Sequence, residues 1–104
     1  MQISVRREGA ALVAQLDEAR LDAAVAIQFK DRLREIAAGA PERVILDLSR
    51  VEFLDSSGLG AVIAVMKMLG PDRRLELAAL GPAVERVVRL TRMDTVFTIH
   101  AEAP

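Results

Sequence analysis

The residues best suited to chemistry in this sequence form one short run, Asp55-Ser56-Ser57-Gly58, which follows the apolar pair Phe53-Leu54. Aspartate and serine side chains accept hydrogen bonds from the first backbone amides of a helix, and glycine allows the chain a tight entry. Helix capping is therefore one interpretation of the run. The same geometry also supports a functional interpretation, because a helix N-terminus carries roughly half a positive charge and favours an anion such as a serine phosphate. The sequence leaves both interpretations open.

That run needs a strand before it and a helix after it, and the hydrophobic pattern predicts both. The predicted strands are an N-terminal hairpin from Ile3 to Leu16 with its turn at Glu8-Gly9, followed by Val44–Leu48, Leu75–Leu80 and Val96–Ile99. The predicted helices are Ala23–Ala38, Ser57–Leu69 and a third that begins after Gly81-Pro82. The order β-β-α-β-α-β-α-β predicts an α/β fold: a mixed, mostly parallel sheet with helices packed on it.

The first predicted helix has a clear apolar face. Its larger apolar residues recur every three or four positions, at Val25, Phe29, Leu33 and Ile36. Asp22 precedes the helix as a candidate N-cap, and Gly39-Ala40-Pro41 ends it.

Composition excludes several classes of function. The chain has 104 residues, which predicts one domain over residues 1–104. Cysteine is absent, which excludes disulfides, zinc-thiolate sites and thiol nucleophiles and leads us to expect a reducing compartment, the cytoplasm. The net charge is −1 and Tyr and Trp are absent, so nucleic acid is not an expected partner. The apolar runs are too short for a signal peptide or a membrane span.

The longer run Leu54-Asp55-Ser56-Ser57-Gly58-Leu59-Gly60 resembles the STAS domain family, particularly the bacterial anti-sigma factor antagonists. Three weaker segments add to the resemblance: Arg20-Leu21-Asp22-Ala23, Ile45-Leu46-Asp47-Leu48 and the closing stretch from Leu90 to Phe97. The similarity covers nearly the whole chain. It implies a small STAS-like fold and a non-enzymatic switch protein, without catalytic residues, metal or cofactor of its own.

The resemblance also implies a site and partners. In the family, the first serine of the Asp-Ser-Ser-Gly motif, here Ser56, is phosphorylated by the anti-sigma factor, a serine kinase with a histidine-kinase-like ATPase domain. The unphosphorylated form binds that anti-sigma factor and frees a sigma factor, and a metal-dependent serine phosphatase resets the switch. Weak homodimerisation is a further expected contact, and membrane insertion is not expected. The implied partner-binding residues are Asp22, Asp55, Ser56, Ser57, Gly58, Leu59, Gly60 and Ala64.

The predicted helix after the motif is apolar over most of its circumference. One stripe contains Leu59, Val62, Ile63 and Met66, and the rest is filled largely by Ala61, Val65, Met68 and Leu69. Only Gly60, Ala64 and Lys67 form a weakly apolar or polar strip. Such a helix is buried on most sides or presents part of its surface to a partner. In the second case, a serine phosphate of about −1.5 to −2 charge would exclude the partner electrostatically, without refolding.

A response-regulator receiver is the nearest rival among other protein classes. Asp47 lies in a strand-like run and imitates a receiver's phosphoacceptor, and Asp17-Glu18 imitates its metal-binding acidic pair. A receiver also needs a late lysine near the phosphate, whereas the only lysines are Lys30 and Lys67.

Enzyme motifs fit poorly. Ser56 lacks the Gly-x-Ser-x-Gly setting of a serine hydrolase, and Gly58-x-Gly60 lacks the third glycine of a dinucleotide motif. His100, the single histidine, is expected to be an exposed terminal residue with no carboxylate partner. Within the STAS family, a subunit of a lipid-transporting ABC complex and a stress-signalling scaffold stay open as alternatives to the sigma-factor switch.

Overall fold

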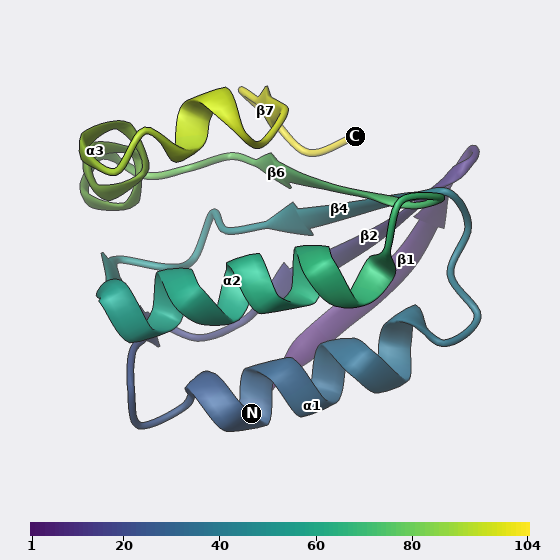
Figure 1. Ribbon diagram of the computed structural model, residues 1–104, viewed down its shortest axis with the longest axis horizontal. Coiled ribbons are helices and arrows are strands. Elements are labelled where there is room, and N and C mark those ends of the chain that lie inside the picture. The colour runs from purple at the N-terminus through teal and green to yellow at the C-terminus, as the bar shows by residue number, and fades with distance from the viewer.

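The computed structural model describes residues 1–104 and is built around a five-stranded sheet. In spatial order its strands are β1 (Ile3–Glu8), β2 (Ala11–Leu16), β4 (Arg43–Asp47), β6 (Arg74–Ala78) and β7 (Ile99–His100). β1 and β2 form the predicted antiparallel hairpin, and the other neighbouring strands are parallel. The predicted mixed, mostly parallel sheet is therefore confirmed (Figure 1).

Helices α1 (Ala26–Ala37) and α2 (Ser56–Leu69) cover one face of this sheet, and α3 (Pro82–Leu90) adds Val84 and Val88 to the same core. Every second strand residue faces them, which gives the main core its strand side chains: Ala14, Leu16, Val44, Leu46, Leu75 and Leu77. The alternate positions point to the other face, where a small separate cluster contains Ala11, Val13, Ile45 and Ala78. The sheet is thus apolar towards the helices and more polar on its uncovered side, as a half-covered sheet requires.

A second, two-stranded parallel sheet consists of β3 (Arg20–Leu21) and β5 (Phe53–Leu54). The hydrophobic pattern did not predict it, because a strand of two residues is too short to show a period of two. It lies in the chain directly before Asp22 and Asp55, so it positions the two loops that lead to α1 and α2.

Helix α1 begins later than predicted, at Ala26 rather than Ala23, and Asp22 is not its N-cap. Instead, the Asp22 Oδ1 atom accepts a hydrogen bond from the Ala24 amide at 3.1 Å and closes a turn before the helix. Of the predicted apolar face, Phe29 and Leu33 are buried and Val25 and Ile36 are partly buried, while Ala26 and Ala37 complete the buried face. Phe29 and Leu33 are fully buried, and each contributes about 1.5–3 kcal/mol through the burial of its side chain.

The predicted last strand, Val96–Ile99, is also wrong in its bounds, because β7 contains only Ile99 and His100. Residues Met93–Thr95 form a 3₁₀ turn, η1, and Val96 continues it in a helical conformation. That turn brings Phe97 into the main core, where it is 5% exposed. The β-branched and aromatic residues of this stretch predicted a strand, but burial of one aromatic ring decided the local conformation.

Glu76 on β6 is the central acceptor of a polar network on the uncovered face of the sheet. Its side chain is 5% exposed and accepts two hydrogen bonds from the Arg43 guanidinium, at 2.8 and 3.3 Å, and one from His100 Nε2 at 2.7 Å. The hydrogen bonds from Arg43, helped by His100, outweigh the opposing effect of burial and lower the pKa of Glu76 to about 2. His100 is therefore half-buried and held by a carboxylate, contrary to the sequence-based expectation.

This network predicts a pH-dependent stability. The folded state lowers the Glu76 pKa below its ordinary 4.5, so the stabilisation is fully present above pH 4.5 and is lost as the pH falls towards about 2. We expect Glu76→Gln to reduce the free energy of unfolding by about 1–3 kcal/mol at neutral pH, and by less at pH 3. Urea unfolding at several pH values measures the difference.

The control is Glu85→Gln, which removes an exposed pair with Arg89 on α3 and should cost about 0.2–0.5 kcal/mol. A loss in Glu76→Gln that stayed constant from pH 7 to pH 3 would contradict the assignment of the stabilisation to the ionised carboxylate.

Candidate functional site

The candidate site begins where Asp55 caps α2. Asp55 has extended backbone geometry, and its Oδ1 atom accepts a hydrogen bond from the Gly58 amide at 2.8 Å. The capping interpretation of the sequence is confirmed for Asp55, and α2 begins one residue earlier than predicted. Ser56 and Ser57 then occupy the first two helical positions, where both are exposed. Neither serine hydroxyl makes a hydrogen bond within the protein, because the aspartate already performs the capping.

The two-stranded sheet brings Asp22 beside this cap. Arg20 pairs with Phe53 and Leu21 with Leu54, so continuing the register places Asp22 next to Asp55. The backbone confirms the approach, since the Asp55 amide lies 3.4 Å from the Leu21 carbonyl oxygen. Both aspartates are among the implied partner-binding residues, and the structure brings them close together.

Arg20 and Phe53 belong to the same surface and were missed by the sequence analysis. The Arg20 guanidinium lies 4.2 Å from the centroid of the Phe53 ring, and its Nε atom lies 3.0 Å from Asp22 Oδ2. Phe53 is 38% exposed, unlike the fully buried Phe29. Each of the two residues precedes an aspartate by two positions, which puts it on the same side of its strand. That spacing became informative only once the two short strands were known.

Gly58 holds the site together through a backbone contact. A β-carbon at this position would lie 2.0 Å from the Leu21 carbonyl oxygen and 2.9 Å from Leu54 Cδ1. Only glycine lets α2 approach β3 so closely. Gly58 and Leu59 are both buried, so these two members of the predicted binding set position the site and do not offer side chains to a partner.

The outer side of α2 is formed by the strip that the sequence analysis singled out. Gly60 and Lys67 are exposed and Ala64 is half-buried. Most of the apolar excess of the helix lies instead in the main core, through Leu59, Ala61, Val62, Val65 and Leu69. The apolar circumference of α2 is therefore explained largely by the core, and what remains outside is a narrow surface of small residues that begins at Ser56.

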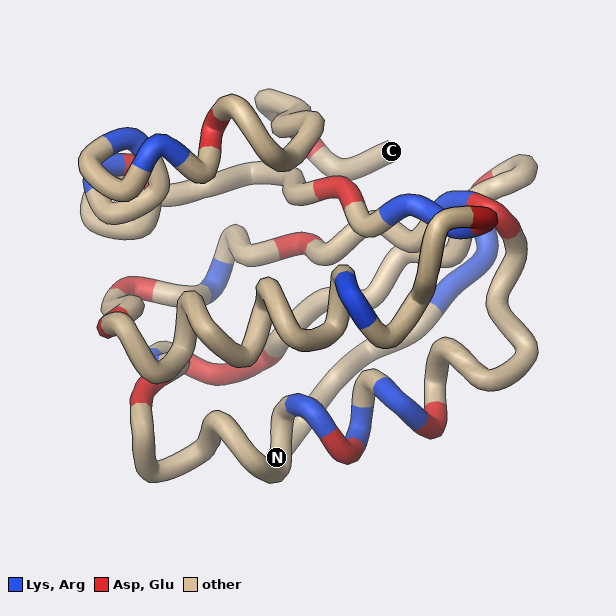
Figure 2. Tube along the Cα trace, viewed as in Figure 1, with Lys and Arg blue, Asp and Glu red and all other residues tan.

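Negative charge predominates at the end of the molecule that carries Ser56. Asp55 caps α2, Asp22 lies beside it and is paired with Arg20, and Glu52 precedes Asp55 by three residues in the chain. Figure 2 shows several acidic segments, in red, at this end of the trace. A phosphate on Ser56 would be close to the positive end of the α2 dipole, which favours it, and also close to these carboxylates, which repel it.

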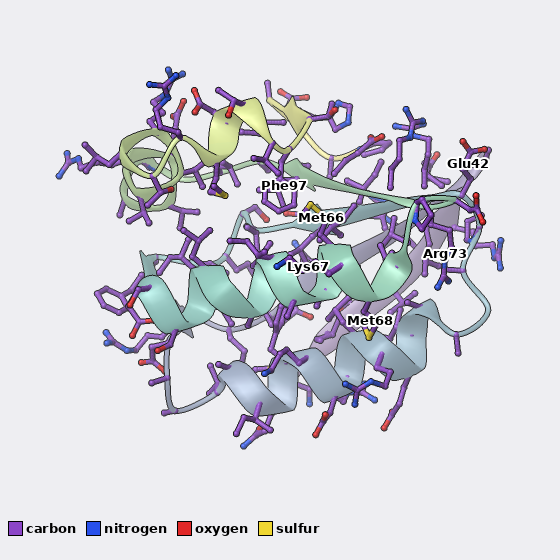
Figure 3. The ribbon with its side chains drawn as sticks, viewed as in Figure 1. Glu42, Met66, Lys67, Met68, Arg73 and Phe97 are labelled. Atoms are coloured by element: carbon purple, nitrogen blue, oxygen red, sulfur yellow. The ribbon has the colours of Figure 1, made fainter.

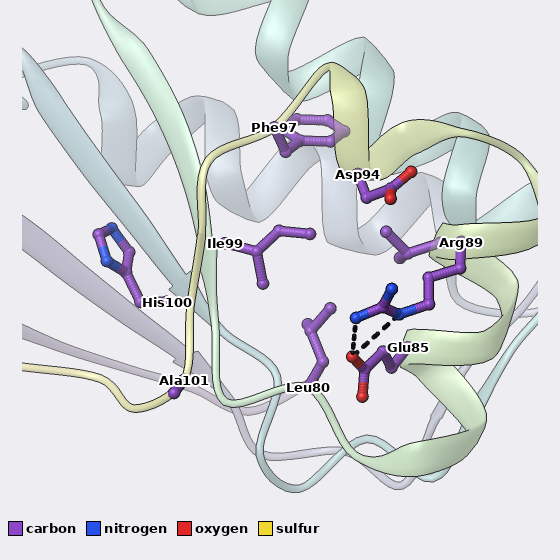
Figure 4. A pocket seen from close by; sticks show the side chains of 9 residues that line it. Leu80, Glu85, Arg89, Asp94, Phe97, Ile99, His100 and Ala101 are labelled. Atoms are coloured by element: carbon purple, nitrogen blue, oxygen red, sulfur yellow. Dashed lines mark hydrogen bonds and ion pairs between the residues drawn. The ribbon is translucent and has the colours of Figure 1, made fainter.

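A large open pocket lies elsewhere in the protein. Its volume is about 550 Å³, and it lies between α3, η1 and β7, with no lining residue from α2 or from the loop before it (Figure 4). Glu85 and Arg89 at its rim pair with each other, with a nitrogen–oxygen distance of 2.9 Å. Because neither Ser56 nor any other residue of the Asp55–Gly58 run lines this pocket, we place the candidate site at the start of α2.

Neither His100 nor Asp47 is placed as the rival interpretations require. Ile99 and His100 point to opposite sides of β7 (Figure 4), and the His100 ring faces Glu76 on the uncovered side of the sheet, away from the helices and Ser56. Asp47 is buried, and its Oδ1 atom accepts a hydrogen bond from the Ser49 amide at 2.8 Å. No group of three or more acidic or histidine side chains is arranged to hold a metal ion, and no helix is both long and apolar enough to span a bilayer.

Comparison with known proteins gives a consistent result. A family model described as the STAS domain matches residues 2–103. The anti-sigma-F factor antagonist RsfB of Mycobacterium tuberculosis is 29% identical over 81 residues, which cover 78% of this chain and 66% of the relative; the chain thus spans slightly less than two thirds of that protein. A STAS-domain containing protein of Pseudomonas aeruginosa is 27% identical over 88% of this chain and 90% of its own.

A solved structure agrees with these sequence relatives. The crystal structure of an anti-sigma factor antagonist from Mycobacterium paratuberculosis superposes with a TM-score of 0.85 at 28% identity, and it covers 96% of this chain and 85% of that one. The fold predicted from the family resemblance is therefore confirmed.

The Gly58 contact predicts opposite effects for two glycines of one helix. Gly58→Ala introduces a β-carbon into the Leu21 backbone, and we expect a loss of about 1–3 kcal/mol in the free energy of unfolding. Gly60→Ala is the matched control, because nothing lies within 4 Å of its β-carbon position; it should gain about 0.5–1 kcal/mol from helix propensity. Thermal and urea unfolding measure both, and equal effects would refute the contact.

Proposed function

The chain belongs to the STAS domain family, and from this premise we propose that it works as an anti-sigma factor antagonist. In the proposal, the unphosphorylated protein binds an anti-sigma factor that is also a serine kinase with a histidine-kinase-like ATPase domain, and the anti-sigma factor then releases its sigma factor. Phosphorylation of Ser56 ends the binding, and a metal-dependent serine phosphatase restores it. The protein acts in the cytoplasm as a binding module and not as an enzyme.

The observation that carries the proposal is the state of the Ser56 side chain. It is exposed, makes no hydrogen bond within the protein, and stands at the first position of a 14-residue helix. Asp55 satisfies the helix cap and Gly58 anchors the turn, so the backbone that presents Ser56 is held from both sides. A kinase therefore meets a hydroxyl that is accessible and already positioned, without having to break an internal contact.

The covalent step is a phosphoryl transfer. The Ser56 Oγ atom forms a bond to the γ-phosphorus of ATP, the bond from that phosphorus to the β,γ-bridging oxygen breaks, and ADP leaves. The hydroxyl proton passes to a general base of the kinase. The product carries about −1.5 to −2 additional charge on a chain whose formal net charge is −1.

Release of the partner follows from electrostatics at a fixed surface. The new phosphate lies beside Asp55 and Asp22 within the proposed interface, so a partner that fits this surface must either face like charge or leave an anion poorly solvated. Such juxtapositions cost several kcal/mol, and each 1.4 kcal/mol or so is a factor of ten in affinity. The helix dipole keeps the phosphate locally acceptable, so α2 does not need to unfold.

Phosphorylation is tested by intact mass spectrometry. The protein is mixed with ATP and each recombinant histidine-kinase-like anti-sigma factor encoded by its genome, in parallel with Ser56→Ala and Ser57→Ala. We expect one phosphate on the wild type and on Ser57→Ala, and none on Ser56→Ala. Phosphate that persists in Ser56→Ala would refute the site. No phosphate with any of the kinases would favour the other STAS binding roles.

Partner exclusion without refolding is tested with Ser56→Asp. The circular dichroism spectrum should match the wild type, since an acidic residue suits the first turn of a helix. Affinity for the kinase found above, measured by isothermal titration calorimetry, should fall at least tenfold. A changed spectrum that accompanied lost binding would instead indicate a conformational switch.

The small-residue strip is tested with Gly60→Gln. The added side chain points into open solvent, so thermal stability should stay equal or rise slightly. We expect the affinity for the same kinase to fall at least tenfold because the partner loses its close approach to α2. Gly39→Gln, at another open position beyond the end of α1, is the control and should bind like the wild type. Equal affinities for both variants would exclude the strip from the interface.

A further inference from the structure

Helices α1 and α2 lie side by side and leave a shallow groove between their outer faces. A cavity of about 50 Å³ marks its floor and is lined by Lys30, Arg34, Ala64, Val65 and Met68. Met68 points from α2 towards α1, whereas Met66 lies on the opposite side of α2 (Figure 3). We call this surface the α1–α2 groove and define it by Ile27, Lys30, Arg34, Gly60, Ala64, Lys67 and Met68.

Two cations, Lys30 and Arg34, line this cavity, and Lys67 is exposed on α2 next to Met68; the two lysines have no intramolecular partner. Neither Lys30 nor Lys67 takes part in an ion pair, although these are the only lysines of the chain. Arg34 is paired with Asp31 at 3.2 Å, but both side chains are more than half exposed. Exposed pairs of this kind contribute about 0–1 kcal/mol, so Arg34 can exchange its partner at little cost.

The groove also offers apolar contact next to these charges. Ile27, one turn before Lys30 on α1, is 69% exposed and is therefore accessible to a partner. Gly60 and Ala64 across from it carry almost no side chain, which lets another backbone approach α2 closely. Met68 is half-buried and flexible, so it can adapt to an inserted side chain.

We propose that the α1–α2 groove binds an acidic amphipathic helix of the anti-sigma factor, an inference that rests on the function proposed above. The apolar side of that helix packs on Ile27, Gly60 and Ala64. Its carboxylates pair with Lys30, Arg34 and Lys67. Charge complementarity favours an acidic helix over the alternatives. A basic helix would be repelled by the three cations, and a neutral helix would bury the two lysine ammonium groups without a counter-charge.

The proposal links the groove to Ser56. Ser56 and Ala64 lie on the same helix, eight residues apart, which is about 12 Å along its axis at 1.5 Å per residue. This separation is close to the Debye length of about 8–10 Å at physiological ionic strength. A phosphate on Ser56 thus repels an acidic helix in the groove directly, and it partly cancels the attraction that Lys30 and Lys67 exert on that helix.

Two charge reversals on α1 test the proposal. Lys30→Glu changes a groove residue, and Arg32→Glu makes the same change two positions away, where the side chain pairs with Glu35 and does not line the groove. Association rate and affinity for the kinase identified by phosphorylation are measured by surface plasmon resonance at low and high salt. We expect Lys30→Glu to lose tenfold or more in affinity, with a smaller loss at high salt, and Arg32→Glu to stay within twofold.

A second variant guards against misfolding. Lys30→Gln removes the charge without adding a new one, and it should reduce the affinity in the same direction but by less. The proposal is overturned if the wild type, Lys30→Glu and Lys30→Gln bind with equal affinity. It is also overturned if Lys30→Glu and Arg32→Glu lose the same affinity. In either case, binding and Ser56 phosphorylation of the wild type would still support the proposed function. If no kinase binds or phosphorylates the wild type, both the proposed function and the proposed groove interaction are refuted.

Discussion

The close approach of Gly58 to the Leu21 carbonyl is the contact on which the arrangement around Ser56 depends. It presses the first turn of α2 against β3, and β3 is in turn paired with β5. Asp55 completes the junction, since its amide faces the Leu21 carbonyl and its carboxylate caps the helix. These backbone contacts join segments that are far apart in the chain, and the side chains of Ser56 and Ser57 take no part in holding them together.

The two faces of the sheet differ in polarity, and this difference explains how the apolar side chains are distributed. The helix-covered face takes almost all large aliphatic side chains, including most of those on α2. The uncovered face is held by a polar network in which Glu76 joins Arg43 and His100 across three neighbouring strands. This division leaves the outer side of α2 with small residues, and a surface of small residues can lie close to another protein without a deep pocket.

Charge is distributed along the two outer helices in a way that suits a phosphate switch. Carboxylates surround the start of α2, whereas unpaired lysines lie further along the groove between α1 and α2. With a formal net charge of −1, the protein has no strong overall field, so local groups dominate what a partner meets. One phosphate at the acidic end would change that local balance more than any single side chain can.

Local periodicity and capping were enough to predict the class of fold, the hairpin, the bounds of α2 to within one residue and the run that contains Ser56. The phosphorylation of Ser56 and the partner surface stay predictions. Only the folded structure revealed the short strands β3 and β5, the approach of Asp22 to Asp55, the place of Arg20 on Phe53 and the contact of His100 with Glu76. They could not be predicted because each joins residues distant in the chain, and such contacts depend on packing and register, which leave no local pattern.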